Sequence, residues 1–220
     1  MGNKTSVHVT KHPSLWEGLA GLLLFLLFAV SCSESGEVED EEFGNWQARN
    51  EAYFATLEDS LSRGGSAWKK IKTFTKDPST AGVNTDYVYA KVLETGDGTT
   101  SPLYSDSVRV SYRGRLIPSV TYPEGYVFDQ TYVGNFNIRT TGVLDGVAGD
   151  FKEGFSTALQ AMHKGDRWRV YVPYALGYGS QSQTGIPAYS VLVFDVALID
   201  FISGSGAFVP WTSRQSSPTR

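Results

Sequence analysis

The stretch Val108-Arg-Val-Ser-Tyr-Arg-Gly114 alternates apolar and polar side chains at every step. Successive side chains of a β-strand point to opposite faces, so Val108, Val110 and Tyr112 would share one face. The same alternation returns in Arg167-Trp-Arg-Val-Tyr-Val-Pro173. Both stretches therefore predict strands with one face turned toward a core.

Two further stretches predict strands. Val191-Leu-Val-Phe-Asp-Val-Ala-Leu-Ile199 is apolar on both faces, which is typical of a central strand. The segment Asp86-Tyr-Val-Tyr-Ala-Lys-Val-Leu-Glu94 has the two-residue period, and Gly96-Asp97-Gly98 supplies a turn directly after it.

One helix-like segment lies between these strands. Phe155, Leu159 and Met162 are spaced i, i+4, i+7, and His163-Lys164-Gly165 is typical of a helix C-terminus. Antiparallel strands around a single short helix predict an α+β fold, in which a curved antiparallel sheet wraps around that helix.

Residues 1–31 have the pattern of a signal peptide. The apolar run from Gly18 to Val30 has about 13 residues, whereas a membrane span needs about 20. The sequence Ala29-Val30-Ser31-Cys32 resembles a bacterial lipobox, so we expect a lipid anchor on Cys32. This predicts an exported lipoprotein of the cell envelope, in the outer membrane of a Gram-negative bacterium. An unmodified thiol in a plain signal peptide is the alternative.

The rest of the N-terminal region divides into two segments. Residues 32–43 predict an acidic, flexible tether, and a surface-sorting signal is the alternative function of its acidic run. Residues 44–82 predict a helical extension, with an amphipathic helix from Asn45 to Leu61. This helix either packs on the main domain or forms an arm for a homodimer.

The main domain is expected over residues 83–203, followed by a flexible tail over residues 204–220, with Phe208 to Trp211 as an exception within it. The formal net charge of −4 gives no electrostatic case for nucleic acid. The 3 histidines and the 1 cysteine provide no clustered metal ligands, and neither a phosphate-binding loop nor a dinucleotide fingerprint is present. We expect no metal and no cofactor.

Five short motifs occur in the order that is typical of FKBP-type prolyl isomerases. They are Val110-Ser-Tyr112-Arg-Gly114, Val127-Phe128-Asp129, the helix from Gly154 to Met162, Leu176-Gly-Tyr178-Gly179, and Gly185-Ile186-Pro187 followed by Leu192-Val-Phe194-Asp195. From about Val83 to Phe201, over half of the chain, the sequence resembles this family. The resemblance implies an FKBP-like fold and peptidyl-prolyl cis/trans isomerase activity.

The resemblance also implies a shallow apolar pocket that binds a proline ring of a client polypeptide. Electrostatic and positioning roles in catalysis would fall to Tyr112, Asp129, Phe155 and Tyr178. Substrate contacts would come from Phe128, Leu144, Phe151, Lys152, Ile186 and Phe194, with Phe136 as the competitor of Leu144. For each aromatic residue taken alone, ordinary core packing is the alternative.

Three features depart from the family pattern. Phe155 occupies a position where many relatives carry Trp, and Lys152 one where Ile or Val is typical. The segment between Asp129 and Phe155 is longer than in minimal members. These departures leave open a weakly catalytic or non-catalytic peptide-binding or chaperone module on the same fold. A surface lipoprotein that binds glycans through exposed aromatics is a third possibility.

Overall fold

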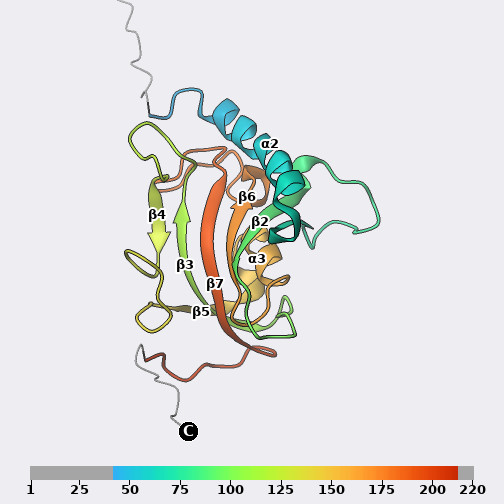
Figure 1. Ribbon diagram of the computed structural model, residues 1–220, viewed down its shortest axis with the longest axis vertical. Coiled ribbons are helices and arrows are strands. Elements are labelled where there is room, and N and C mark those ends of the chain that lie inside the picture. Colours follow the sequence, from blue (N-terminus) through green and yellow to red (C-terminus); the bar gives the residue numbers. More distant parts are fainter. Residues whose placement is uncertain (1–41, 213–220) are drawn as a thin grey trace, which may run out of the picture. The chain divides into compact units, whose positions relative to one another are not determined.

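A computed structural model describes residues 42–212 of the chain (Figure 1). The predicted signal peptide, the lipobox with Cys32 and nearly all of the acidic tether lie outside the described residues.

A seven-stranded antiparallel sheet forms the centre of the domain (Figure 1). Its order is β1-β2-β6-β7-β3-β4, and β5 pairs with β3 beside this path. The strands are β1 (Trp68–Lys72), β2 (Tyr87–Glu94), β3 (Ser107–Arg115), β4 (Val127–Gln130), β5 (Leu144–Val147), β6 (Arg167–Val172) and β7 (Leu192–Ile202). The four strands predicted from the sequence correspond to β2, β3, β6 and β7, and β7 lies between β6 and β3 as expected for a central strand.

The short helix α3 (Glu153–Leu159) packs against one face of the sheet. Its residue Gly154 lies so close to β6 that a Cβ there would stand 2.4 Å from Cγ1 of Val172. Val110, Val170 and Val172 are fully buried on the same side. The predicted fold, a curved antiparallel sheet around one short helix with an N-terminal helical extension, is confirmed.

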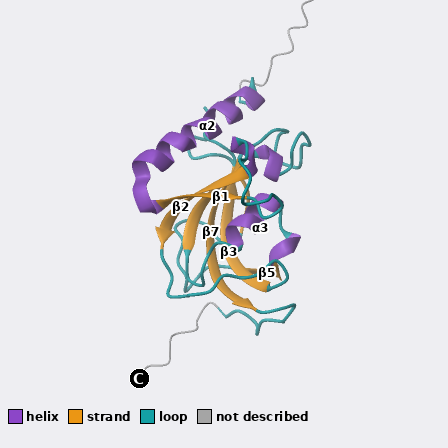
Figure 2. Ribbon diagram, turned by 90° about the vertical axis from the view of Figure 1, so that its right-hand side faces the viewer, coloured by secondary structure: helices purple, strands orange, loops and turns teal. Residues whose placement is uncertain are grey.

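The longer helix α2 (Trp46–Gly64) covers part of the opposite face (Figure 2). Its Tyr53 ring lies 6.3 Å from that of Tyr171, the residue before Val172 on β6, and neighbouring strand residues face opposite ways. The Trp46 indole N–H donates to Ser190 Oγ at 2.8 Å, so the start of the helix is tied to the domain. Of the two roles predicted for this helix, the structure shows packing on its own domain.

Single-turn helices complete the described fold: η1 (Gly65–Ala67), η2 (Asn84–Asp86), η3 (Ala148–Asp150) and η4 (Tyr174–Leu176). The sheet begins earlier than the predicted boundary at residue 83, because β1, from the segment assigned to a helical extension, pairs with β2.

The segment after β7 contacts β3. The Arg109 guanidinium lies 4.5 Å from the Phe208 ring, and Arg109 also donates to the Val209 carbonyl at 2.9 Å. Within residues 42–212 no helix is long and apolar enough to cross a membrane.

Candidate functional site: an aromatic cleft

Three aromatic rings from three different elements meet where the family resemblance predicts the proline-binding pocket, here called the aromatic cleft. The Phe155 ring, on α3, lies 4.8 Å from Phe194 on β7 and 5.8 Å from Tyr112 on β3, in both cases edge to face. All three side chains are buried, and Phe155 is only 4% exposed. Edge-to-face contacts of this kind add to the stability that burial provides. The structure therefore brings together Phe155 and Tyr112, predicted for catalysis, and Phe194, predicted to contact the substrate.

Phe128 reaches this cluster through an irregularity in β4. The pairing of β3 with β4 shifts between Gly114, opposite Asp129, and Arg115, opposite Val127, so Phe128 is the extra residue of a β-bulge. Its ring lies 5.7 Å from that of Phe194. A Cβ at Gly114 would stand 2.6 Å from the Phe128 ring and 2.8 Å from the Phe194 ring. Glycine at position 114 therefore leaves space for the Phe128 and Phe194 rings.

A hydrogen bond joins the buried cluster to its polar rim. The Tyr112 hydroxyl donates to Asp129 Oδ2 at 2.5 Å, and Asp129 itself is exposed. Burial in the first place, and then the hydrogen bond to Asp129, raise the pKa of the Tyr112 hydroxyl above its ordinary value of 10.0. The hydroxyl therefore stays protonated over the physiological range and keeps the carboxylate in place.

Phe151, Lys152 and Tyr178 form the edge nearest to α3. The Phe151 ring lies 5.1 Å from Phe155, and the Lys152 carbonyl accepts the Ser156 N–H at 2.9 Å, which starts the helix. The exposed Lys152 side chain extends over Tyr178, with the ammonium 4.7 Å from the ring centroid. A cation thus stands where the family resemblance predicts an aliphatic side chain.

The remaining predicted residues lie at different distances from this cluster. Ile186 is buried within the loop that follows Tyr178. Leu144 is 39% exposed on β5. A Cβ at Gly146 would point toward the Phe151 ring, and Leu144, two residues earlier, lies on the same face of the strand. Phe136 is elsewhere, with its ring against Tyr132 and the Arg167 guanidinium 5.0 Å away. Leu144 is therefore better placed than Phe136 to face the cleft.

The residues of the aromatic cluster offer apolar rings rather than groups for acid–base or metal chemistry. In the part of the chain that the structure describes, no group of three His, Cys, Asp or Glu side chains could hold a metal ion. His163, whose backbone N–H donates to Asp166 Oδ2, belongs to the turn after α3. Polar groups next to the cluster include the Asp129 carboxylate, bonded to Tyr112, and the Lys152 ammonium over the Tyr178 ring.

A curved antiparallel sheet that wraps one short helix, with an aromatic cluster where the helix meets the sheet, is the arrangement of an FKBP-like domain. Residues 98–199 match the family described as FKBP-type peptidyl-prolyl cis-trans isomerase, and this part of the chain is an FKBP-type domain. The matched segment contains β3 to β6, α3 and most of β7. It excludes α2, β1 and β2.

Curated relatives carry names from the same family. The chain is 38% identical over 112 residues to the macrophage infectivity potentiator of Trypanosoma cruzi, which covers 50% of each chain. It is 36% identical over 127 residues to the FKBP-type peptidyl-prolyl cis-trans isomerase FkpA of Escherichia coli K12, over 58% of this chain and 42% of that protein. The chain thus spans about half the length of the curated relatives it matches.

Solved structures agree with the fold. The crystal structure of FkpA from Escherichia coli superimposes with a TM-score of 0.53 at 25% identity, over 88% of this chain and 75% of that one. A peptidyl-prolyl cis-trans isomerase from Pseudomonas syringae matches with a TM-score of 0.50 at 21% identity, which supports the fold alone.

Sequence reasoning missed one group of residues around Ile186. Phe43, Tyr122 and Tyr126 line a cavity together with Ile186. The alternation of β-strands could not reveal them, because all three lie outside the strands. The closely spaced tyrosines of the loop before β4 were the one signal available.

Proposed function

We propose that the domain catalyses cis/trans isomerisation of X–Pro peptide bonds in client polypeptides. Rotation about a peptide bond costs about 18–20 kcal/mol because the planar amide is stabilised by resonance. X–Pro bonds populate both isomers but exchange over tens to hundreds of seconds. A site that binds the twisted amide more tightly than either planar form lowers this barrier without a nucleophile or cofactor.

The aromatic cluster is the single observation that carries the proposal. Phe155 forms the base, and Tyr112 and Phe194 flank it within 5.8 Å and 4.8 Å, which suits a proline ring. The twisted amide has lost resonance, so its carbonyl is less polar and an apolar wall favours it over the planar forms. The Tyr178 hydroxyl would hold a carbonyl of the bound peptide, and Asp129, held by Tyr112, would orient polar groups at the rim.

A peptide-binding module with little catalysis is the second candidate, favoured by the ammonium of Lys152 at the cleft edge. A protease-coupled assay on a proline tetrapeptide separates the two functions. We expect turnover by the wild type, its loss in Phe155→Ala, and a fall of about tenfold in Tyr178→Phe, which removes one hydrogen-bonding hydroxyl. Phe136→Ala removes an aromatic ring outside the cleft and serves as the matched control. Wild-type turnover at background would favour the binding module.

The domain would assist the folding of exported proteins, tethered by a lipid on Cys32. The support is the order of segments in the sequence: a signal-like apolar run, a lipobox-like stretch and an acidic tether before the domain. Cys32→Ala should release the protein from the membrane fraction. Unchanged fractionation together with unchanged gel mobility would contradict the anchor.

Domain boundaries and assembly are also proposals. We infer a domain over residues 83–203 with an extension over residues 44–82 that contributes α2 and β1. A homodimer through α2 stays a prediction. The helix buries Trp46, Phe54 and Leu57 against its own domain, so an interface would use its exposed side. Analytical ultracentrifugation of the protein at micromolar concentration tests this.

A further inference from the structure

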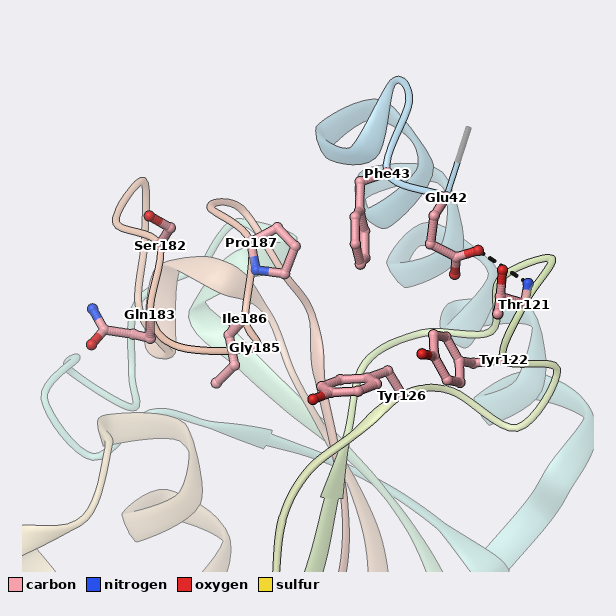
Figure 3. A pocket seen from close by; sticks show the side chains of 10 residues that line it. All are labelled: Glu42, Phe43, Thr121, Tyr122, Tyr126, Ser182, Gln183, Gly185, Ile186 and Pro187. Atoms are coloured by element: carbon pink, nitrogen blue, oxygen red, sulfur yellow. Dashed lines mark hydrogen bonds between the residues drawn. The ribbon is translucent and has the colours of Figure 1, made fainter. Parts of the chain in front are cut away.

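A cavity of about 530 Å³ is lined in part by Ile186, one of the residues predicted to contact the substrate (Figure 3). Its walls come from the segment Glu42–Phe43 that leads into α2, from the loop between β3 and β4, and from the loop before β7. Figure 3 shows Phe43, Tyr126 and Pro187 around one shared space. A volume of this size falls within the range of ligand pockets, about 300–1,000 Å³.

The lining of the cavity is mostly apolar. Phe43, Tyr122, Tyr126, Ile186 and Pro187 supply rings and an aliphatic chain. Glu42 is the one charged residue among the described residues that line it, so the cavity offers no cation to an anionic ligand. Aromatic walls with tyrosine hydroxyls and a few polar side chains at the margin match a large apolar side chain that belongs to a polypeptide.

Hydrogen bonds fix the walls on both sides. The Thr121 N–H donates to Glu42 Oε2 at 3.0 Å, and the Arg49 guanidinium donates to the Glu42 carbonyl at 2.8 Å. On the facing wall, Gln183 and Ile186 exchange backbone hydrogen bonds of 2.8 Å and 3.0 Å. The cavity is therefore preformed, so little ordering of the protein would accompany binding.

Two segments link the cavity to the aromatic cluster along the chain. Tyr126, which lines the cavity, precedes Phe128, in the bulge of β4, by two residues. The facing loop is closed at its base by hydrogen bonds from Gln181 N–H to the Tyr178 carbonyl and from Tyr189 N–H to the Gly179 carbonyl. Ile186, a predicted contact of the proline ring, also lines the cavity. Two residues of extended chain span at most about 7 Å, so a polypeptide with its proline against Phe128 would reach Tyr126 within a few residues.

We propose that this cavity, here called the flanking subsite, binds a large apolar side chain of the client, a few residues from the proline held in the cleft. The proposal rests on the proposed isomerase function and deepens it, because it names a class of preferred substrate. Phe43 lies outside the segment that matches the family, so a residue from beyond that segment completes the subsite.

The test uses the full-length protein and a set of peptides. The parent peptide has one Ala-Pro bond among Gly and Ser residues, and each further peptide carries one Phe, two to four residues before or after the proline. The readout is the ratio of kcat/KM between a Phe-containing peptide and the parent. We expect a ratio of about 10 at one or more positions, the lower end of what burying a large apolar side chain contributes.

Three variants make the test specific. Tyr122→Ala removes one wall of the cavity and should lower the best ratio to about 2. Ser182→Trp places a bulky side chain at an exposed position of the lining and should also lower the ratio. Tyr104→Ala removes a comparably exposed tyrosine that packs on Phe74 away from the cavity, and should keep the ratio of the wild type. Thermal unfolding of each variant shows which proteins are folded.

The outcomes separate this inference from the proposed function. Turnover of the parent peptide with ratios near one at every position would overturn the flanking subsite and leave the isomerase intact. An equal fall in Tyr104→Ala and Tyr122→Ala would also overturn it. Absence of turnover with every peptide would overturn the isomerase, and the flanking subsite with it.

Discussion

The ammonium nitrogen of Lys152 lies 4.7 Å from the centroid of the Tyr178 ring, at the edge of the aromatic cleft. Lys152 is exposed, and it takes part in none of the ion pairs among the described residues. A positive charge with no ion-pair partner among residues 42–212 therefore stands over the ring whose hydroxyl would hold a carbonyl of the bound peptide.

This charge should select among clients. We expect wild-type protein to prefer a peptide with Glu beside the proline over one with Lys, by about two- to fivefold, since exposed charges interact by up to about 1 kcal/mol. Lys152→Gln should abolish the preference, and about 1 M salt should weaken it in the wild type. The measurement is the ratio of kcat/KM for the two peptides.

Lys164→Gln is the matched control for that prediction. It removes the same charge at an exposed position. Lys164 follows α3 in the sequence, whereas Lys152 precedes it, and Lys164 pairs with Asp200 at 2.9 Å. An equal loss of preference in both variants would show that the net charge of the protein acts, and not Lys152.

The sequence predicted the frame of this site but not its margins. Strict alternation identified the strand carrying Tyr112, and the i, i+4, i+7 spacing identified the helix carrying Phe155. The bulge that turns Phe128 inward could not be predicted, because a strand of four residues is too short to show an alternation of apolar and polar side chains. The flanking subsite depends on Phe43 meeting a loop near residue 186, and no local pattern predicts so distant a contact.

The hydroxyl of Tyr112 should make the stability of the protein depend on pH in the alkaline range. Its pKa in the folded protein is above the ordinary value of 10.0, so above about pH 10 the unfolded chain loses this proton first and unfolding becomes more favourable. Below that pH both states carry the proton and the contribution is constant. Tyr112→Phe should cost about 1 kcal/mol at pH 8 through the lost hydrogen bond to Asp129, and less at pH 11. Urea unfolding at the two pH values measures this, and a difference that grows with pH would contradict it.

The glycine at position 114 should be required for the cleft. A Cβ there would stand 2.6 Å from the Phe128 ring, closer than atoms in contact allow, so Gly114→Ala must displace that ring or Phe194. We expect a loss of stability of about 1–3 kcal/mol and a marked fall in kcat/KM. Chemical denaturation and the peptide assay check the two effects, and unchanged values of both would contradict the packing described.

A buried ion pair should hold the strands behind the cleft. Asp195, next to Phe194 on β7, accepts hydrogen bonds from Arg115 Nη2 and Arg169 Nε, both at 2.6 Å. Asp195→Asn leaves the buried Arg115 without its counter-charge and should cost about 3 kcal/mol of stability. Asp200→Asn, in the exposed pair with Lys164, should change stability by less than about 1 kcal/mol. Similar values for the two variants in denaturant unfolding would contradict this role.

The central claim is that the cleft around Phe155 catalyses X–Pro isomerisation, and nuclear magnetic resonance exchange spectroscopy tests it most directly. The cis and trans signals of a proline peptide are followed with a catalytic amount of the full-length protein, so binding alone produces no exchange between them. We predict exchange within the second timescale for the wild type, far faster than for the free peptide, and none beyond the free-peptide rate for Phe155→Ala. Peptide signals that shift on binding, with a cis/trans exchange rate equal to that of the free peptide, would contradict the claim.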